Sequence, residues 1–106
     1  MEIKSINDIE GTSYGDIVVK ELVSGERMSC VYFRLPPGAG APPHAHRAEG
    51  IVYCLGGELE VTVGNERKEI TCGTSVLIPF NMEVGLKNSG NLPAEVIAIG
   101  SPAGIS

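Results

Sequence analysis

Glycine and proline interrupt this chain so often that a long helix has no room to form. The 106 residues include 14 glycines and 7 prolines, which fall at short intervals from Gly11 to Pro93. Proline lacks the amide donor that a helix interior needs, and glycine favours turns. No stretch between these breaks has the length and periodicity of a substantial helix. The spacing therefore predicts a chain of strands and tight turns.

The segments between the breaks have the composition of β-strands. In residues 58–63, Leu59, Val61 and Val63 alternate with polar residues, as in a half-buried strand. Residues 49–55 are largely apolar, which is typical of a strand buried on both faces, and Gly64-Asn65-Glu66 predicts a hairpin turn. We expect strands at residues 17–22, 27–35, 49–55, 58–63, 67–71, 74–78, 82–86 and 94–99. Many short strands indicate one all-β domain over residues 1–106, a sandwich or a closed barrel.

Composition excludes several classes of function. Eight Lys and Arg against thirteen Asp and Glu give a net charge of −5, which argues against a nucleic-acid partner. No apolar run approaches the roughly 20 residues that span a bilayer, so we expect no membrane partner. The first residues lack the apolar centre of a signal peptide, and the expected location is cytoplasmic. The three cysteines have no Cys-x-x-Cys spacing and are predicted to be free thiols.

Both histidines lie in one short stretch, His44-Ala45-His46, between a Pro/Gly loop and an apolar segment. In extended backbone, residues i and i+2 point to the same side, so the two imidazoles can converge. Because neutral imidazole is a common metal ligand, the pair predicts a metal site. The alternative is a pair that lines a pocket or faces solvent. Two imidazoles alone make a weak metal site, so affinity depends on a third group.

The histidines stand in a frame that resembles the first motif of the cupin family of small jelly-roll β-barrels. That motif runs from a glycine through His-x-His and a glutamate to a closing glycine. Here Gly38, His44 and His46 fit the spacing, and Gly57 falls at the closing glycine. Gly50 occupies the position of the family's metal-binding glutamate.

A second stretch resembles the other cupin motif. Gly73, Pro79 and Asn88 fit its frame, but Asn81 replaces a glycine and Val84 replaces the metal-binding histidine. Together the motifs cover about residues 30–100, and the resemblance implies a cupin-type double-stranded β-helix. The fourth ligand of the family's metal centre is absent.

Glu49, one residue before the expected position, is the candidate third ligand. In a regular strand Glu49 faces away from the barrel interior if Gly50 faces inward. A β-bulge at Gly50 would turn Glu49 inward and complete a site of two histidines and one carboxylate. The predicted metal ligands are therefore His44, His46 and Glu49, for Fe, Mn, Ni or Zn. The alternative is that Glu49 is a solvated charge at a strand edge.

The family's inward-facing positions imply an apolar ligand pocket formed by Val52, Cys54, Met82 and Val84. Cys54 is also an alternative metal ligand, provided that its thiol lies close enough to the metal to lose its proton. These residues favour a pocket for a small organic ligand over a polar catalytic cleft.

Two functions follow from the resemblance. The first is a small cupin that binds a divalent metal weakly and a small organic ligand beside it, with dioxygenase or isomerase chemistry. The second is a metal-free cupin that serves as a binding, sensing or structural dimerisation module, which Val84 favours. The resemblance also implies a homodimer, in which residues 17–22 pack across the partner.

Overall fold

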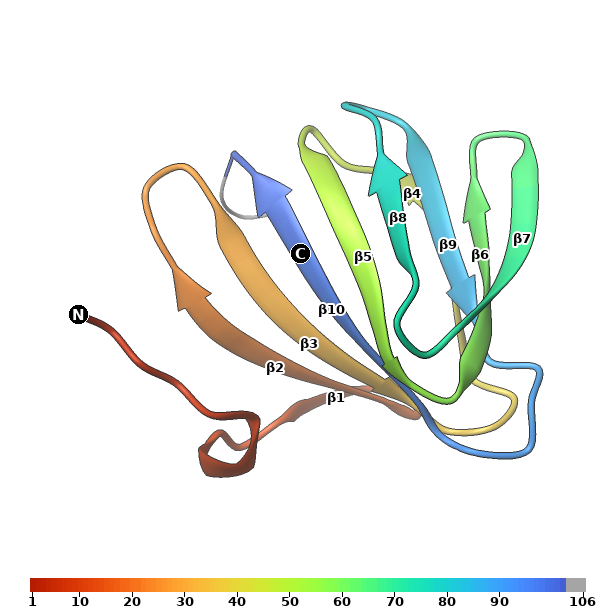
Figure 1. The fold of residues 1–106 in the computed structure, drawn as a ribbon, viewed down its shortest axis with the longest axis horizontal. Coiled ribbons are helices and arrows are strands. Elements are labelled where there is room, and N and C mark those ends of the chain that lie inside the picture. Colours follow the sequence, from red (N-terminus) through yellow and green to blue (C-terminus); the bar gives the residue numbers. More distant parts are fainter. Residues whose placement is uncertain (103–106) are drawn as a thin grey trace.

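A computed structural model describes residues 1–102, and its regular secondary structure is almost entirely β-strand (Figure 1). Residues 103–106, the end of the predicted single domain, lie outside the described residues. The elements are η1 (Ile6–Asp8), β1 (Thr12–Tyr14), β2 (Ile17–Ser24), β3 (Ser29–Leu35), β4 (Gly40–Ala45), β5 (Glu49–Gly56), β6 (Glu58–Val63), β7 (Glu66–Thr71), β8 (Ser75–Ile78), β9 (Glu83–Lys87) and β10 (Ala94–Ser101). The all-β prediction is confirmed, and the eight predicted strands are all present. No helix in the described part of the chain is long and apolar enough to cross a membrane.

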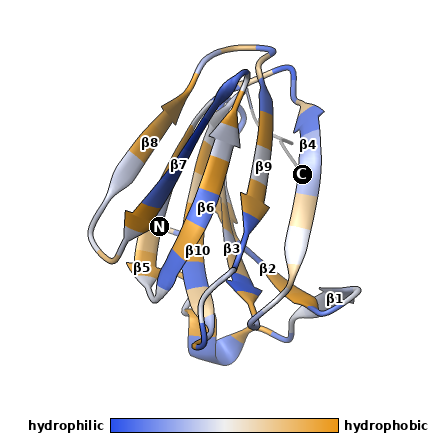
Figure 2. Ribbon diagram, turned by 90° about the vertical axis from the view of Figure 1, so that its right-hand side faces the viewer, coloured by the Kyte–Doolittle hydropathy of each residue, from blue (hydrophilic) through white to orange (hydrophobic). Residues whose placement is uncertain are grey.

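The strands form two antiparallel sheets. One has six strands in the order β1-β2-β3-β10-β5-β8, and the other has four in the order β4-β9-β6-β7. Figure 2 views the molecule from the side of the four-stranded sheet, which lies in front of the six-stranded one. Strand β2, which we expected to pack across a partner, pairs inside the chain with β3 and, over residues 17–19, with β1.

Strand β4 was expected to be a loop, because it contains Pro42 and Pro43. It is an edge strand, paired with β9 alone, and proline is tolerated there because one side of the strand needs no ladder hydrogen bonds. The pairing shifts by one residue between Ala41 and His44, across the two prolines. A Cβ at Gly85 on β9 would lie 2.8 Å from the Pro43 ring, so the glycine makes room for the proline. The sequence pattern did not predict this strand, because a segment with two prolines can form a strand only at a place such as the sheet edge, and the sequence pattern does not show where the edge lies.

The core lies between the sheets and contains one buried polar side chain with a clear structural role. Asn88 has no exposed surface, and its amide nitrogen donates to the carbonyl oxygens of Leu35 (2.9 Å) and Leu92 (2.8 Å). Its side-chain oxygen accepts from the amide of Gly90 at 2.9 Å. All three bonds satisfy groups that burial would otherwise leave unpaired. Asn88 therefore joins the end of β3 to the loop before β10.

Candidate functional site

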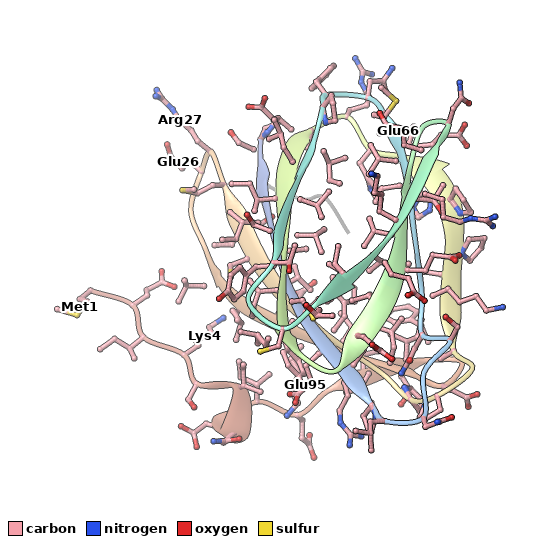
Figure 3. All side chains as sticks on the ribbon, turned by 45° about the vertical axis from the view of Figure 1, so that its right-hand side comes forward. Met1, Lys4, Glu26, Arg27, Glu66 and Glu95 are labelled. Carbon is pink, nitrogen blue, oxygen red and sulfur yellow. The ribbon has the colours of Figure 1, made fainter. Side chains whose placement is uncertain are left out.

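A cavity of about 510 Å³ lies between the two sheets, and we call it the intersheet cavity. The six-stranded sheet contributes mostly apolar side chains to its wall, among them Val31, Phe33 and Val52, and the four-stranded sheet contributes Val84 and Leu86. Side chains from both sheets project into the space between them (Figure 3). This volume and lining are compatible with a small organic molecule.

Both histidines lie on the wall of the intersheet cavity. His44 is on β4, and His46 follows the end of that strand. Their ring centroids are 4.3 Å apart and the ring planes are inclined by 53°. The sequence prediction that the two imidazoles converge is therefore matched by their geometry.

The backbone beside the histidines is fixed by the turn before β9. The Asn81 amide donates to the His46 carbonyl oxygen at 3.1 Å, and the Met82 amide donates to the Pro79 carbonyl oxygen at 3.2 Å. Asn81 has a φ of 63°, in the left-handed region that asparagine tolerates better than most residues. Asparagine can therefore stand where the family motif has glycine, and it ties this turn to the histidine segment.

Burial and charge favour the neutral form of His46. Partial burial lowers the pKa of His46 below its ordinary value, and the neighbouring His44 lowers it further. A neutral imidazole offers one hydrogen-bond donor and one acceptor to a molecule in the cavity.

Glu49 does not join the histidines. Its side chain is exposed and is not part of the cavity wall. Strand β5 keeps a regular register with β10 from Glu49 to Cys54, and the register shift comes later, at Leu55. The hypothesised bulge at Gly50 is therefore wrong, and period-two alternation leaves Gly50 on the cavity wall with Glu49 turned away.

A family model described as "Cupin domain" matches residues 31–100. The chain belongs to the cupin family. The "RmlC-like cupin" of Shewanella frigidimarina has a closely similar solved structure, with a TM-score of 0.89, 24% sequence identity, and coverage of 97% of this chain and 92% of that one. The predicted cupin-type double-stranded β-helix is confirmed by this likeness in fold.

Curated relatives of this cupin are longer proteins. "Germin-like protein subfamily 2 member 2" of Arabidopsis thaliana is 34% identical over 101 residues, 88% of this chain and 46% of that protein. "Mannose-1-phosphate guanylyltransferase 2" of Escherichia coli O157:H7 is 33% identical over 79 residues, 73% of this chain and 16% of that protein. The chain thus spans less than half of the length of each.

The donor set of this cupin does not fit the metal centre that the family motifs describe. Within residues 1–102, no group of three or more His, Cys, Asp or Glu side chains is placed to hold a metal ion. Val84, at the position of the missing histidine, pairs with His44 across the β4–β9 ladder and presents an apolar side chain to the cavity. Zinc and the related transition metals are normally held by at least three protein ligands. Two imidazoles remain, and they are too few for such a centre.

Two of the four pocket residues expected from the sequence lie on the cavity wall, Val52 and Val84. Cys54 is fully buried behind the wall, with its thiol directed to the carbonyl oxygens of Gly56 (3.5 Å) and Gly57 (3.7 Å). Burial raises the pKa of the Cys54 thiol, which opposes its use as a thiolate ligand.

Met82 was predicted to line the ligand pocket, but its side chain lies elsewhere. A Cβ placed at Gly64 would lie 2.9 Å from the Met82 Sδ, so this side chain packs over the β6–β7 turn and is not among the cavity-lining residues. Period-two alternation applies only within β9, and Met82 precedes that strand, so its side chain is not held to the inward face.

The sequence interpretation also missed two polar residues of the cavity wall, Tyr14 and Glu21. A signal for Glu21 was present, because it follows Ile17 and Val19 with period two in the predicted strand 17–22. Tyr14 had no such signal, since β1 has only three residues, all of them exposed.

Proposed function

We propose that this cupin binds a small, largely apolar organic molecule in the intersheet cavity, and that binding needs no metal ion. The observation that carries the proposal is a cavity of about 510 Å³ with a mostly apolar wall and two imidazoles as hydrogen-bonding groups. An apolar body gains affinity from burial, and His44 and His46 orient a polar group on it. The protein is thus a binding or sensing module.

The other function expected from the sequence, a metal-dependent dioxygenase or isomerase, requires more ligands than the chain brings together. Glu49 is turned away from the histidines, and Val84 adds no donor. A divalent ion bound by two imidazoles would need its remaining ligands from water or from the bound molecule, and its affinity would be low. These features support the metal-independent function.

The test is binding of a neutral probe, 1-hexanol, followed by amide chemical shifts in NMR. Because each buried methylene contributes about 0.8 kcal/mol, we expect dissociation constants of about millimolar. The largest shifts should fall on cavity residues such as Val52 and Val84. The variant Val84→Phe places a larger side chain in the cavity and should weaken binding about tenfold. The control Val23→Phe, which changes an exposed side chain outside the cavity wall, should leave binding unchanged.

The same assay, with a chelator added, tests whether binding of 1-hexanol needs a metal ion. Treating the protein with EDTA should leave the affinity for 1-hexanol unchanged. Loss of binding after EDTA, restored by a divalent ion, would overturn the metal-independent proposal. Shifts confined to residues outside the cavity would overturn the cavity as the binding site.

Self-association, implied by the family resemblance, stays a prediction. Light scattering checks it: a homodimer gives twice the molar mass of the 106-residue chain, and a monomer mass at high concentration would end the expectation.

A further inference from the structure

One acidic side chain, Glu21, lies on the wall of the intersheet cavity. It is on β2, two residues after Val19 and four after Ile17, both of which also line the cavity. In the β2–β3 ladder it pairs directly with Val31, another lining residue. Since paired residues of antiparallel strands project from the same face, Glu21 is held on the cavity side of the sheet.

Of the cavity-lining residues that the structure describes, Glu21 is the single Asp, Glu, Lys or Arg. Its side chain is exposed, so it lies where the apolar wall meets solvent. Within residues 1–102, no basic side chain forms an ion pair with it. The other polar side chains on the described part of the wall are Tyr14, His44 and His46, and none of them forms a hydrogen bond with Glu21.

An exposed carboxylate is ionised at neutral pH and accepts hydrogen bonds without donating any. Placed beside an apolar cavity, it is complementary to a cation attached to an apolar body. A ligand whose apolar part fills the cavity also excludes water near the carboxylate, which strengthens the attraction. A ligand carboxylate in the same place would be repelled.

We propose that Glu21 makes the cavity selective for amphipathic ligands that carry an ammonium or similar nitrogen cation. This inference rests on the proposed function, because it adds a cationic group to the molecule that the intersheet cavity takes, separate from the polar group that His44 and His46 orient. It places the charged head at β2, across the cavity from the histidines of the other sheet.

The test compares three probes with one apolar body and different heads: hexylammonium, 1-hexanol and hexanoate. Binding to the wild-type protein is followed by NMR at about pH 8. We expect hexylammonium to bind about three- to tenfold more tightly than 1-hexanol, and hexanoate to bind more weakly than 1-hexanol.

Two variants with the same change of net charge separate a local effect from a global one. Glu21→Gln should make the affinities for hexylammonium and 1-hexanol equal while leaving that for 1-hexanol unchanged. Glu26→Gln is the matched control, because Glu26 lies at the turn between β2 and β3 (Figure 3) and outside the cavity wall. It should retain the wild-type order of affinities.

Each result is decisive. Equal binding of the three probes to the wild-type protein, or equal effects of the two variants, would overturn the role of Glu21 and leave the proposed function standing. Failure of 1-hexanol itself to bind would overturn the proposed function and, with it, this inference.

Discussion

His44 pairs with Val84 across the β4–β9 ladder, so an apolar side chain stands beside the imidazole at the place where the family motif has another histidine. Both side chains line the same cavity. At this position the chain keeps the cupin frame and lacks one of the metal ligands that the family motif has. The pair also shows where a ligand could be restored.

The variant Val84→His should build a third imidazole beside His44 and His46. We expect its affinity for Ni²⁺ or Zn²⁺ to rise by about tenfold to a hundredfold over the wild-type protein, because such sites normally have at least three protein ligands. Isothermal titration calorimetry measures the gain. The control Leu77→His adds a histidine to an exposed position outside the cavity wall. An equal gain in both variants would show that the third imidazole does not act at this site.

Glu49→Gln should bind divalent metal neither more nor less tightly than the wild-type protein, because the Glu49 carboxylate is exposed and turned away from the histidines. The double variant His44→Ala/His46→Ala should bind divalent metal more weakly than both of these proteins. Metal titrations of the three proteins provide the measurement. If Glu49→Gln lost affinity as the double variant does, Glu49 would have to be counted as a ligand.

His46 should make stability fall in mild acid. Burial, and then the neighbouring His44, lower the pKa of His46 in the folded state. Below its ordinary pKa of about 6.5 the unfolded chain therefore takes up a proton more readily than the folded one. The contribution of His46 to the free energy of unfolding is therefore complete above about pH 6.5 and decreases as the pH falls below that value. The decrease stops once the pH is below the pKa of His46 in the folded state.

Imidazole NMR titration and urea unfolding at several pH values check the expectation for His46. His46→Gln should flatten this part of the stability profile, and His44→Gln should raise the pKa of His46 towards its ordinary value. A wild-type His46 that titrates above 6.5 would contradict the argument.

Tyr32 should make stability fall at alkaline pH. Its hydroxyl donates to the Glu95 carboxylate, and burial together with this bond raises the pKa of Tyr32 to about 12. Because the folded pKa lies above the ordinary value of 10.0, stability is complete below about pH 10 and is lost as the pH rises towards 12. Tyr32→Phe should remove this dependence and cost about 1–2 kcal/mol at neutral pH. Urea unfolding measures both effects, with Tyr53→Phe, an exposed tyrosine, as the control.

Gly57→Ala should destabilise the fold more than Gly73→Ala. Both glycines have positive φ, 71° and 89°, where a side chain costs about 1–2 kcal/mol. At Gly57 a Cβ would also lie 2.5 Å from the Pro93 carbonyl oxygen, whereas at Gly73 it would meet no atom within 4 Å. We expect a loss of about 3–5 kcal/mol for Gly57→Ala. Equal losses in the two variants would show that the backbone conformation, not the close approach, sets the cost.

Strand positions were predictable wherever side chains alternate or are continuously apolar, as in residues 49–55 and 58–63. In these segments the pattern of apolar residues is enough to predict a strand, because burial of one or both faces of a strand determines which residue types it contains. Strand β4 was not predictable, since Pro42 and Pro43 are compatible with a strand only at a sheet edge, and the edge is a property of the whole topology.

The sequence by itself determined the all-β fold, the cupin frame and the convergence of His44 and His46, because turn residues, alternation and i, i+2 spacing are local. Only the tertiary structure decided what stands around the histidines. The register of β5 against β10 turns Glu49 away, and the β4–β9 ladder sets Val84 beside His44. The pairing of β2 with β3 places Glu21 on the cavity wall. Each of these depends on contacts between strands distant in the chain, which local pattern does not specify.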